Sequence, residues 1–198
     1  MVQAVFRLYL FPDARAGLCT AWAVKSRGRD EAYYVTAGHC EIAQYINDSG
    51  RFVRSPLVAA SSADRSDVGI GIRPDHRVHR AFLPLDSTPA RPGDRALGIG
   101  FPDGMLMAST MTVLGDTTDG LIALRSSVPL AGGWSGAPLV SLATGRVIGV
   151  LEGRAERDPQ IAVAVPAATV RAVLESVQSQ VLDANPPTAS SAAVTSAP

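Results

Sequence analysis

Short apolar or alternating runs recur at close intervals along most of the chain, each about as long as one β-strand. The runs cover residues 5–10, 18–24, 33–36, 51–58, 68–72, 96–100, 105–113, 121–125, 137–142, 146–151 and 161–165. Turn-forming segments such as 48–50 (DSG) and 118–120 (TDG) separate them and interrupt any helical period. Many short strands with turn signals between them are typical of an antiparallel barrel or sandwich. The pattern therefore predicts an all-β protein and argues against a parallel α/β fold.

The strand runs fall into two groups of roughly equal size. Between the groups, residues 84–94 (PLDSTPARPGD) are rich in Pro, Ser, Thr and Asp. This composition is typical of a connecting segment rather than of a strand. We therefore predict an N-terminal β unit at 1–83, an interdomain crossover at 84–94 and a C-terminal β unit at 95–165.

The last part of the chain has a helical period instead. Apolar side chains recur there at intervals of three or four residues, at Val170, Val173, Leu174, Val177 and Val181. Pro166 suits the first turn of a helix, so we predict one helix at 166–182 that packs on the β units. Residues 183–198 contain no aromatic side chain and one large aliphatic one, and are predicted to form a disordered tail or a linker.

Composition and charge narrow the possible functions. The 198 residues hold 18 basic and 18 acidic side chains, so no field of one sign favours nucleic acid or a cationic partner. No run approaches the roughly 18 consecutive apolar residues that a membrane-spanning helix needs. We predict no nucleic-acid partner and no membrane span, and the sequence predicts no oligomeric state.

One serine lies in a segment suited to an exposed nucleophile. Ser135 stands in the run 132–138 (GGWSGAP), with glycine close before it and directly after it. Glycine allows a tight backbone from which a hydroxyl can project and in which N–H groups can converge on one point. By itself this run could equally be an ordinary Gly-rich hairpin. To act as a nucleophile, Ser135 therefore requires a general base and a carboxylate that orients this base.

Candidates for both partners occur upstream. His39, in TAGHC at 36–40, follows a predicted strand and has a side chain suited to act as a general base near neutral pH. Asp67 directly precedes the apolar run 68–72, so it should stand at the mouth of a buried strand and could hold the imidazole in one tautomer. Asp64 is nearby, but the strand begins directly after Asp67. We predict His39, Asp67 and Ser135 as a catalytic triad.

Together, TAGHC, DVGI at 67–70 and GWSGAP, in the order His, Asp, Ser, resemble the chymotrypsin/trypsin-like serine peptidases. The runs 96–102 (ALGIGFP), 135–150 (SGAPLVSLATGRVIGV) and 161–166 (IAVAVP) are similar to the bacterial high-temperature-requirement proteases. The resemblance covers the chain up to about residue 182. It implies two six-stranded antiparallel β-barrels, and a serine endopeptidase that cleaves polypeptide substrates through an acyl-enzyme.

The same resemblance implies how the site is completed. The backbone N–H groups of Gly133 and Ser135 should form the oxyanion hole, and the strand 150–154 should line the cleft and pair with the substrate backbone. Trp134 stands where relatives that mature by cleavage have an aspartate, so zymogen activation of that kind is not expected. Regulation by a PDZ domain, which often follows the helix in those bacterial proteases, is not expected from residues 183–198.

The resemblance also pairs the only two cysteines. Cys19, in CTAW at 19–22, should form a disulfide with Cys40 that fastens the loop of His39, whereas in a cytosolic protein both would remain thiols. The disulfide favours a periplasmic or secreted protein. The first residues nevertheless lack the long apolar region and the cleavage site of a signal peptide.

In the resembled family the base of the specificity pocket lies six residues before the nucleophile, here at Pro129. Proline offers no carboxylate to a Lys or Arg side chain, and its neighbours are apolar or small, so we predict cleavage after small or medium apolar residues. The predicted substrate-binding residues are Pro129, Leu130, Ala131, Gly132, Val150, Leu151, Glu152, Gly153 and Ala162. Glu152 and Arg154 could turn inward and change this preference, or lie at a solvated strand edge.

Two other functions stay open. One is a catalytically silent peptide-binding module with the same fold, although a pseudoenzyme has usually lost at least one triad residue. The other is a viral-type serine protease that processes a polyprotein, which differs only in its substrate. We predict no cofactor and no metal, because His76 and His79 have no neighbouring ligands in the sequence.

Overall fold

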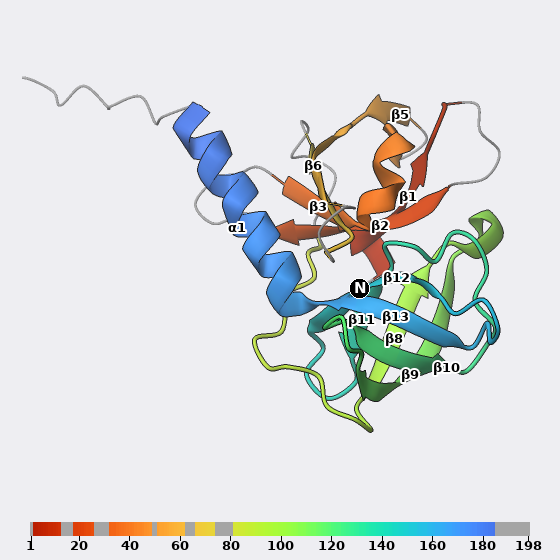
Figure 1. The fold of residues 1–198 in the computed structure, drawn as a ribbon. Helices are drawn as coiled ribbons and strands as arrows, with labels where there is room; N and C mark the ends of the chain where they lie inside the picture. The colour runs from red at the N-terminus through yellow and green to blue at the C-terminus, as the bar shows by residue number, and fades with distance from the viewer. Residues whose placement is uncertain are drawn as a thin grey trace, which may run out of the picture.

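The computed structural model describes residues 2–12, 18–25, 32–48, 51–61, 66–73 and 81–184. In these residues the chain forms two β units that stack on each other, with a long helix along their side (Figure 1). His76, His79, Asp64 and the part of the predicted tail at 185–198 lie outside the described residues.

The N-terminal unit is one antiparallel sheet of seven strands in the order β5-β4-β1-β2-β3-β7-β6. Its elements are η1 (Val2–Ala4), β1 (Val5–Tyr9), β2 (Cys19–Lys25), β3 (Ala32–Thr36), η2 (Gly38–Ile42), β4 (Tyr45–Asp48), β5 (Arg51–Arg54), β6 (Leu57–Ser61) and β7 (Val68–Arg73). The central strand β2 is buried on both faces. Trp22 and Val24 pack into the core between the two units, whereas Ala21 and Ala23 pack into a separate cluster within the sheet.

The prediction of a closed six-stranded barrel is wrong for this unit, which is a half-barrel. Its edge strands β5 and β6 do not pair with each other in the described residues. The predicted run 51–58 is broken at Ser55 and Pro56, and proline has no N–H for a ladder. The Ser55 N–H donates to Gln44 O at 2.8 Å, and its carbonyl accepts from the Tyr34 hydroxyl. The chain therefore turns a corner here instead of closing the sheet.

The C-terminal unit is the closed six-stranded barrel that was predicted, with strand order β10-β13-β12-β11-β8-β9. Its elements are β8 (Arg95–Gly100), η3 (Pro102–Gly104), β9 (Met107–Asp116), β10 (Ile122–Ser126), β11 (Pro138–Ser141), β12 (Val147–Arg154) and β13 (Ile161–Pro166). Fully buried apolar side chains such as Met111, Leu124 and Leu139 fill its interior. Closure removes the exposed strand edges of an open sheet.

The predicted C-terminal helix is confirmed as α1 (Ala167–Ala184). It contacts β12 and β13 of the barrel and β7 of the first sheet. Val170, Leu174 and Val177 on its buried face join the same core cluster as Ile70 of the first unit and Val147 of the second. Because this cluster draws on both units and the helix, burial of apolar surface holds the three parts together. No helix in the described part of the chain is long and apolar enough to cross a membrane.

A disulfide joins Cys19, the first residue of β2, to Cys40 in η2. Both cysteines are buried, and their sequence separation is 21 residues. A crosslink over such a distance lowers the entropy of the unfolded chain.

We expect the Cys19→Ala/Cys40→Ala variant to lose about 3 kcal/mol of unfolding free energy, because the unfolded chain regains the entropy that the crosslink removes. Guanidinium denaturation of the oxidised wild type and of the variant measures the difference. A reducing agent should destabilise the wild type and leave the variant unchanged. Equal midpoints for the oxidised wild type and the variant would contradict a stabilising disulfide.

Candidate active site

The pairing of β3 with β7 brings His39 and Asp67 together. The two strands are antiparallel, with Thr36 opposite Gly69, so the end of β3 lies beside the start of β7. The chain leaves β3 at Thr36 and enters η2, which contains His39, while Asp67 directly precedes β7. The strand register therefore places both side chains at the same edge of the sheet.

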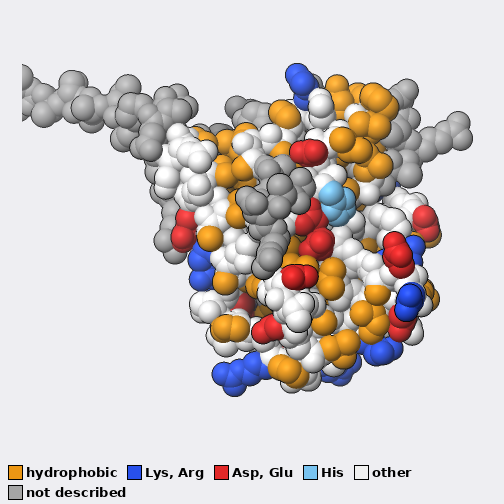
Figure 2. Space-filling view, in the orientation of Figure 1, with side chains coloured by type: hydrophobic (Ala, Val, Ile, Leu, Met, Phe, Trp, Pro, Cys, Tyr) orange, Lys and Arg blue, Asp and Glu red, His pale blue; other side chains and the backbone are white. Residues whose placement is uncertain are grey.

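Asp67 holds His39 through both of its carboxylate oxygens. Oδ1 accepts from the backbone N–H of His39 at 2.7 Å, and Oδ2 lies 2.6 Å from the ring Nδ1. A carboxylate only accepts hydrogen bonds, so Nδ1 carries a proton and Nε2 keeps its lone pair. Figure 2 shows acidic side chains beside a histidine side chain on this face of the molecule.

Several effects act on the pKa of His39. The side-chain hydrogen bond to Asp67 is the largest, and it raises the pKa. Desolvation by burial opposes the rise, and the negative charges of Asp67 and Glu152 add to it. The imidazolium form is therefore favoured by its surroundings, which suits a group that gains a proton during a reaction.

Thr20 of β2 attaches the loop that contains Ser135, residues 131–136 (the serine loop), to the first sheet. Its N–H donates to Ser135 O at 2.8 Å, and its hydroxyl donates to Gly133 O at 2.7 Å. The neighbouring residue Cys19 is bonded to Cys40, which follows His39 in the chain. Adjacent residues of β2 therefore anchor the serine loop and the histidine segment. No signal in the sequence indicates this role of Thr20, because it depends on a contact between distant parts of the chain.

Two glycines of the serine loop have backbone conformations that other residues rarely adopt. Gly133 has φ 95° and Gly136 has φ 83°. A Cβ on Gly136 would collide with Thr20 O and with the Thr36 hydroxyl, and one on Gly133 would collide with Phe101 O. The loop conformation therefore depends on both glycines.

The same loop presents free hydrogen-bond donors. None of the backbone N–H groups of residues 131–135, which include those of Gly133 and Ser135, donates to an acceptor within the described part of the chain. Unpaired N–H groups on one tight loop are the type of donor that stabilises an oxyanion.

The hydroxyl of Ser135 points to β12 in this structure. Its Oγ donates to Glu152 O at 3.3 Å, and no hydrogen bond joins it to the His39 ring. The structure therefore brings His39 and Asp67 into direct contact, whereas the Ser135 hydroxyl is bonded to β12 instead of to the histidine. Catalytic hydrogen bonds are often incomplete in substrate-free enzymes.

A pocket of about 230 Å³ opens beside Ser135. Its lining residues are Leu130, Ala131, Gly132, Trp134, Ser135, Leu151, Gly153 and Arg154. Of the predicted substrate-binding residues, Pro129, Val150, Glu152 and Ala162 are not among them: Pro129 is exposed, and Val150 and Ala162 are buried in the barrel. Trp134 is a lining residue that the prediction did not include, and Arg154, for which the sequence left open an inward position or a solvated strand edge, also lines the pocket. Arg154, which is exposed, is the one charged residue among the lining residues.

One group of residues has the composition of a metal site but cannot act as one. The Sγ atoms of Cys19 and Cys40 and a ring nitrogen of His39 lie within 4.8 Å of one another. Because the sulfur atoms are joined in a disulfide, neither can be a thiolate ligand.

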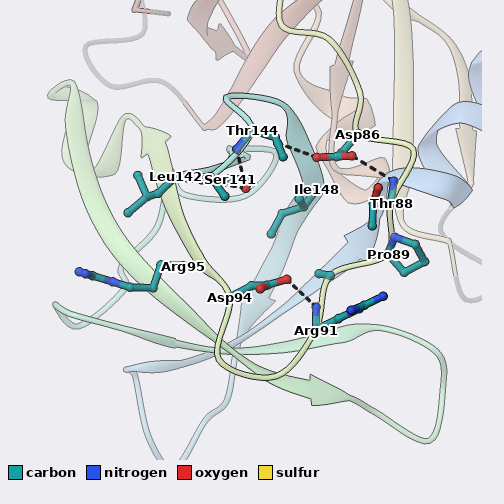
Figure 3. Close-up of a pocket in the computed structure, with 12 residues that line it drawn as sticks. Asp86, Thr88, Pro89, Arg91, Asp94, Arg95, Ser141, Leu142, Thr144 and Ile148 are labelled. Atoms are coloured by element: carbon teal, nitrogen blue, oxygen red, sulfur yellow. Dashed lines mark hydrogen bonds between the residues drawn. The ribbon is translucent and has the colours of Figure 1, made fainter.

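A larger cavity, of about 540 Å³, lies elsewhere on the barrel (Figure 3). It shares no lining residue with the pocket beside Ser135. Its polar groups bond one another: Asp86 accepts from the Thr144 hydroxyl at 2.6 Å, and Asp94 accepts from the Arg91 N–H at 2.8 Å. The bond from Thr144 is the largest cause that lowers the pKa of Asp86. The cavity takes no part in the site described above.

Comparison with known proteins defines the class. A family model described as a trypsin-like peptidase domain matches residues 19–150, more than half of the chain. The chain therefore belongs to the trypsin-like peptidase family, as its sequence motifs indicated. It is a trypsin-like peptidase, a hydrolase that acts on polypeptides. No curated protein sequence matches it.

Solved structures share the fold at low sequence identity. The inactive form of the Rv3671c protease of M. tuberculosis has a TM-score of 0.67 and 19% identity, over 88% of this chain and 89% of that one. A serine endoprotease from Yersinia pestis has a TM-score of 0.73 and 22% identity, over 89% of this chain and 63% of that one. The HtrA-type protease AlgW with a decapeptide has a TM-score of 0.63 and 22% identity, over 81% of this chain and 51% of that one. The chain thus spans less than two thirds of the latter two proteins, and the likeness shows the fold alone.

Proposed function

We propose that His39, Asp67 and Ser135 form the catalytic triad of this serine endopeptidase. The observation that carries the proposal is the double hydrogen bond from His39 to Asp67, which leaves the lone pair of Nε2 free as a base. The loop of Ser135 is attached to the same sheet through Thr20. A base, the carboxylate that orients it and a nucleophile are the parts that acyl transfer requires.

The proposed reaction starts when the Ser135 hydroxyl turns from Glu152 O to Nε2 of His39. His39 takes the hydroxyl proton as Oγ attacks the scissile carbonyl carbon, and the carbonyl oxygen becomes an oxyanion bound by the N–H groups of Gly133 and Ser135. The imidazolium then gives its proton to the leaving amine, and the acyl-enzyme remains. Water, activated in the same way by His39, releases the second product and restores the serine.

The substrate backbone would add as a strand to β12. β12 pairs with β13 as far as Arg154, but its pairing with β11 reaches only from Val147 to Val150. The other edge of residues 152–154 is therefore open beside the Ser135 loop. An extended peptide on this edge would form backbone hydrogen bonds there and place one side chain in the adjacent pocket.

The pocket favours cleavage after small or medium apolar residues. Its walls include Leu130, Ala131 and Leu151, and its volume of about 230 Å³ suits a side chain such as Val, Ala or Leu. Arg154 at the same pocket would repel a Lys or Arg side chain. Each fitted methylene should contribute less than about 1 kcal/mol, so the preference should be graded.

Digestion of a proteome-derived peptide library should show cuts mainly after Val, Ala and Leu, because the pocket walls are apolar and small. Mass spectrometry of the new termini measures the preference, and a parallel digestion with Ser135→Ala supplies the background. Cuts mainly after Lys or Arg would contradict the pocket assignment. Cuts mainly after Asp or Glu would also contradict it, and would indicate that Arg154 selects the substrate.

A further inference from the structure

Glu152 is the extra residue of a β-bulge in β12. On either side of it, Leu151 pairs with Ala164 of β13 and Gly153 pairs with the next residue, Val163. Here β12 advances by two residues where β13 advances by one. Glu152 is therefore the extra residue and has no partner in β13. Bulges of this kind often lie beside active sites, where they redirect a side chain.

The bulge turns Glu152 away from the specificity pocket. Leu151, Gly153 and Arg154 all line that pocket, and Glu152 does not. Its carboxylate instead interacts electrostatically with both His39 and Asp67. The backbone carbonyl of Glu152 accepts from the Ser135 hydroxyl at 3.3 Å. One residue thus touches the nucleophile through its backbone and acts on the base through its side chain.

No ion pair within the described part of the chain compensates this carboxylate. Glu152 is half-buried. The flanking strands β11 and β13 carry no charged residue. Burial is the largest cause that raises the pKa of Glu152; the charge of Asp67 adds to the rise, and His39 opposes it. His39 is therefore the group that offsets two neighbouring carboxylates.

We propose that Glu152 is a positioning residue of this peptidase, a second carboxylate that stabilises the imidazolium form of His39. While His39 is neutral, the charges of Glu152 and Asp67 repel each other. When His39 takes the proton of Ser135, its positive charge relieves that repulsion, so the interaction is stronger in the transition state than in the ground state. The inference rests on the proposed triad.

The first test compares the pH dependence of kcat/KM for the wild type and Glu152→Gln. Glutamine has nearly the same shape and no charge, so His39 should lose its proton at lower pH and the acid limb should move to lower pH. We also expect kcat at the plateau to fall about fivefold because the imidazolium is less stabilised. KM and the preference for the residue before the cleaved bond should stay the same, because Glu152 does not line the pocket.

Two further variants separate charge from structure. Glu152→Asp keeps the charge and should restore most of the pH profile. Glu156→Gln removes an exposed carboxylate two residues beyond β12 and should leave the profile unchanged. An acid limb of Glu152→Gln that stays in place or moves to higher pH overturns the proposal. A changed cleavage preference with an unchanged acid limb also overturns it and assigns Glu152 to the pocket.

A second readout does not depend on activity. In the inactive Ser135→Ala protein, the ring protons of His39 can be titrated by NMR and assigned by their loss in a His39→Ala variant. Adding Glu152→Gln to this protein should lower the pKa of His39, and an unchanged titration overturns the proposal. Retained peptidase activity in Ser135→Ala would instead contradict the proposed triad. The activity assay therefore tests the triad and the titration tests Glu152, so the two failures can be told apart.

Discussion

Ser135→Ala should lower kcat/KM for peptide hydrolysis by a factor of about 10⁴ to 10⁶. The variant would lack the only side-chain hydroxyl of residues 133–136, and the remaining rate would come from the oxyanion donors and from binding alone. Hydrolysis of a fluorogenic peptide measures the loss. A labelled fluorophosphonate should modify the wild type and not the variant.

The variant should keep its fold, because within the described residues the Ser135 hydroxyl forms one long hydrogen bond, to Glu152 O. Equal melting temperatures would confirm this. Ser87→Ala is a matched control, since Ser87 is exposed on the segment between the two units and should be replaceable without effect. More than a few per cent of wild-type activity in Ser135→Ala would disprove the assignment of the nucleophile.

Asp67→Asn should lower kcat/KM by a factor of about 10⁴ near neutral pH. Asp67 accepts from both the backbone N–H and Nδ1 of His39. An asparagine amide can accept through its oxygen, but its NH₂ group donates. With the oxygen kept on the backbone N–H, the NH₂ would face Nδ1 and force the proton onto Nε2. His39 would then hold the wrong tautomer and could not take the proton of Ser135.

The measurement is a rate profile from about pH 5 to pH 10 with the same fluorogenic peptide. Asp119→Asn, which changes an exposed aspartate in a turn of the barrel, is the control and should behave as the wild type. A loss of less than about tenfold in Asp67→Asn would mean that another group orients His39. In that case Glu152 would be the first candidate, because its charge also acts on His39.

Much of the fold could be predicted from local patterns. Alternating runs such as 68–72 and the helical period from Val170 to Val177 indicated strands and a helix where the structure has them. The failures came from tertiary effects. β4 was missed because Tyr45–Asp48 is short and has little apolar pattern, and its pairing with β5 defines it. The corner at Pro56 divided one predicted strand into two and left the first sheet open.

The sequence by itself determined the class of this protein. His39, Asp67 and Ser135 each lie in a short motif that can be recognised without knowledge of the fold, and the three motifs occur in the order of the trypsin-like peptidases. It also indicated the disulfide between Cys19 and Cys40. Only the tertiary structure decided which neighbours complete the site. Thr20 holds the loop of Ser135 from a different sheet, and Glu152 lies at a β-bulge whereas Arg154 lines the pocket. Strand register decides which way each of these side chains points, and register is a property of paired strands that no single segment of sequence specifies.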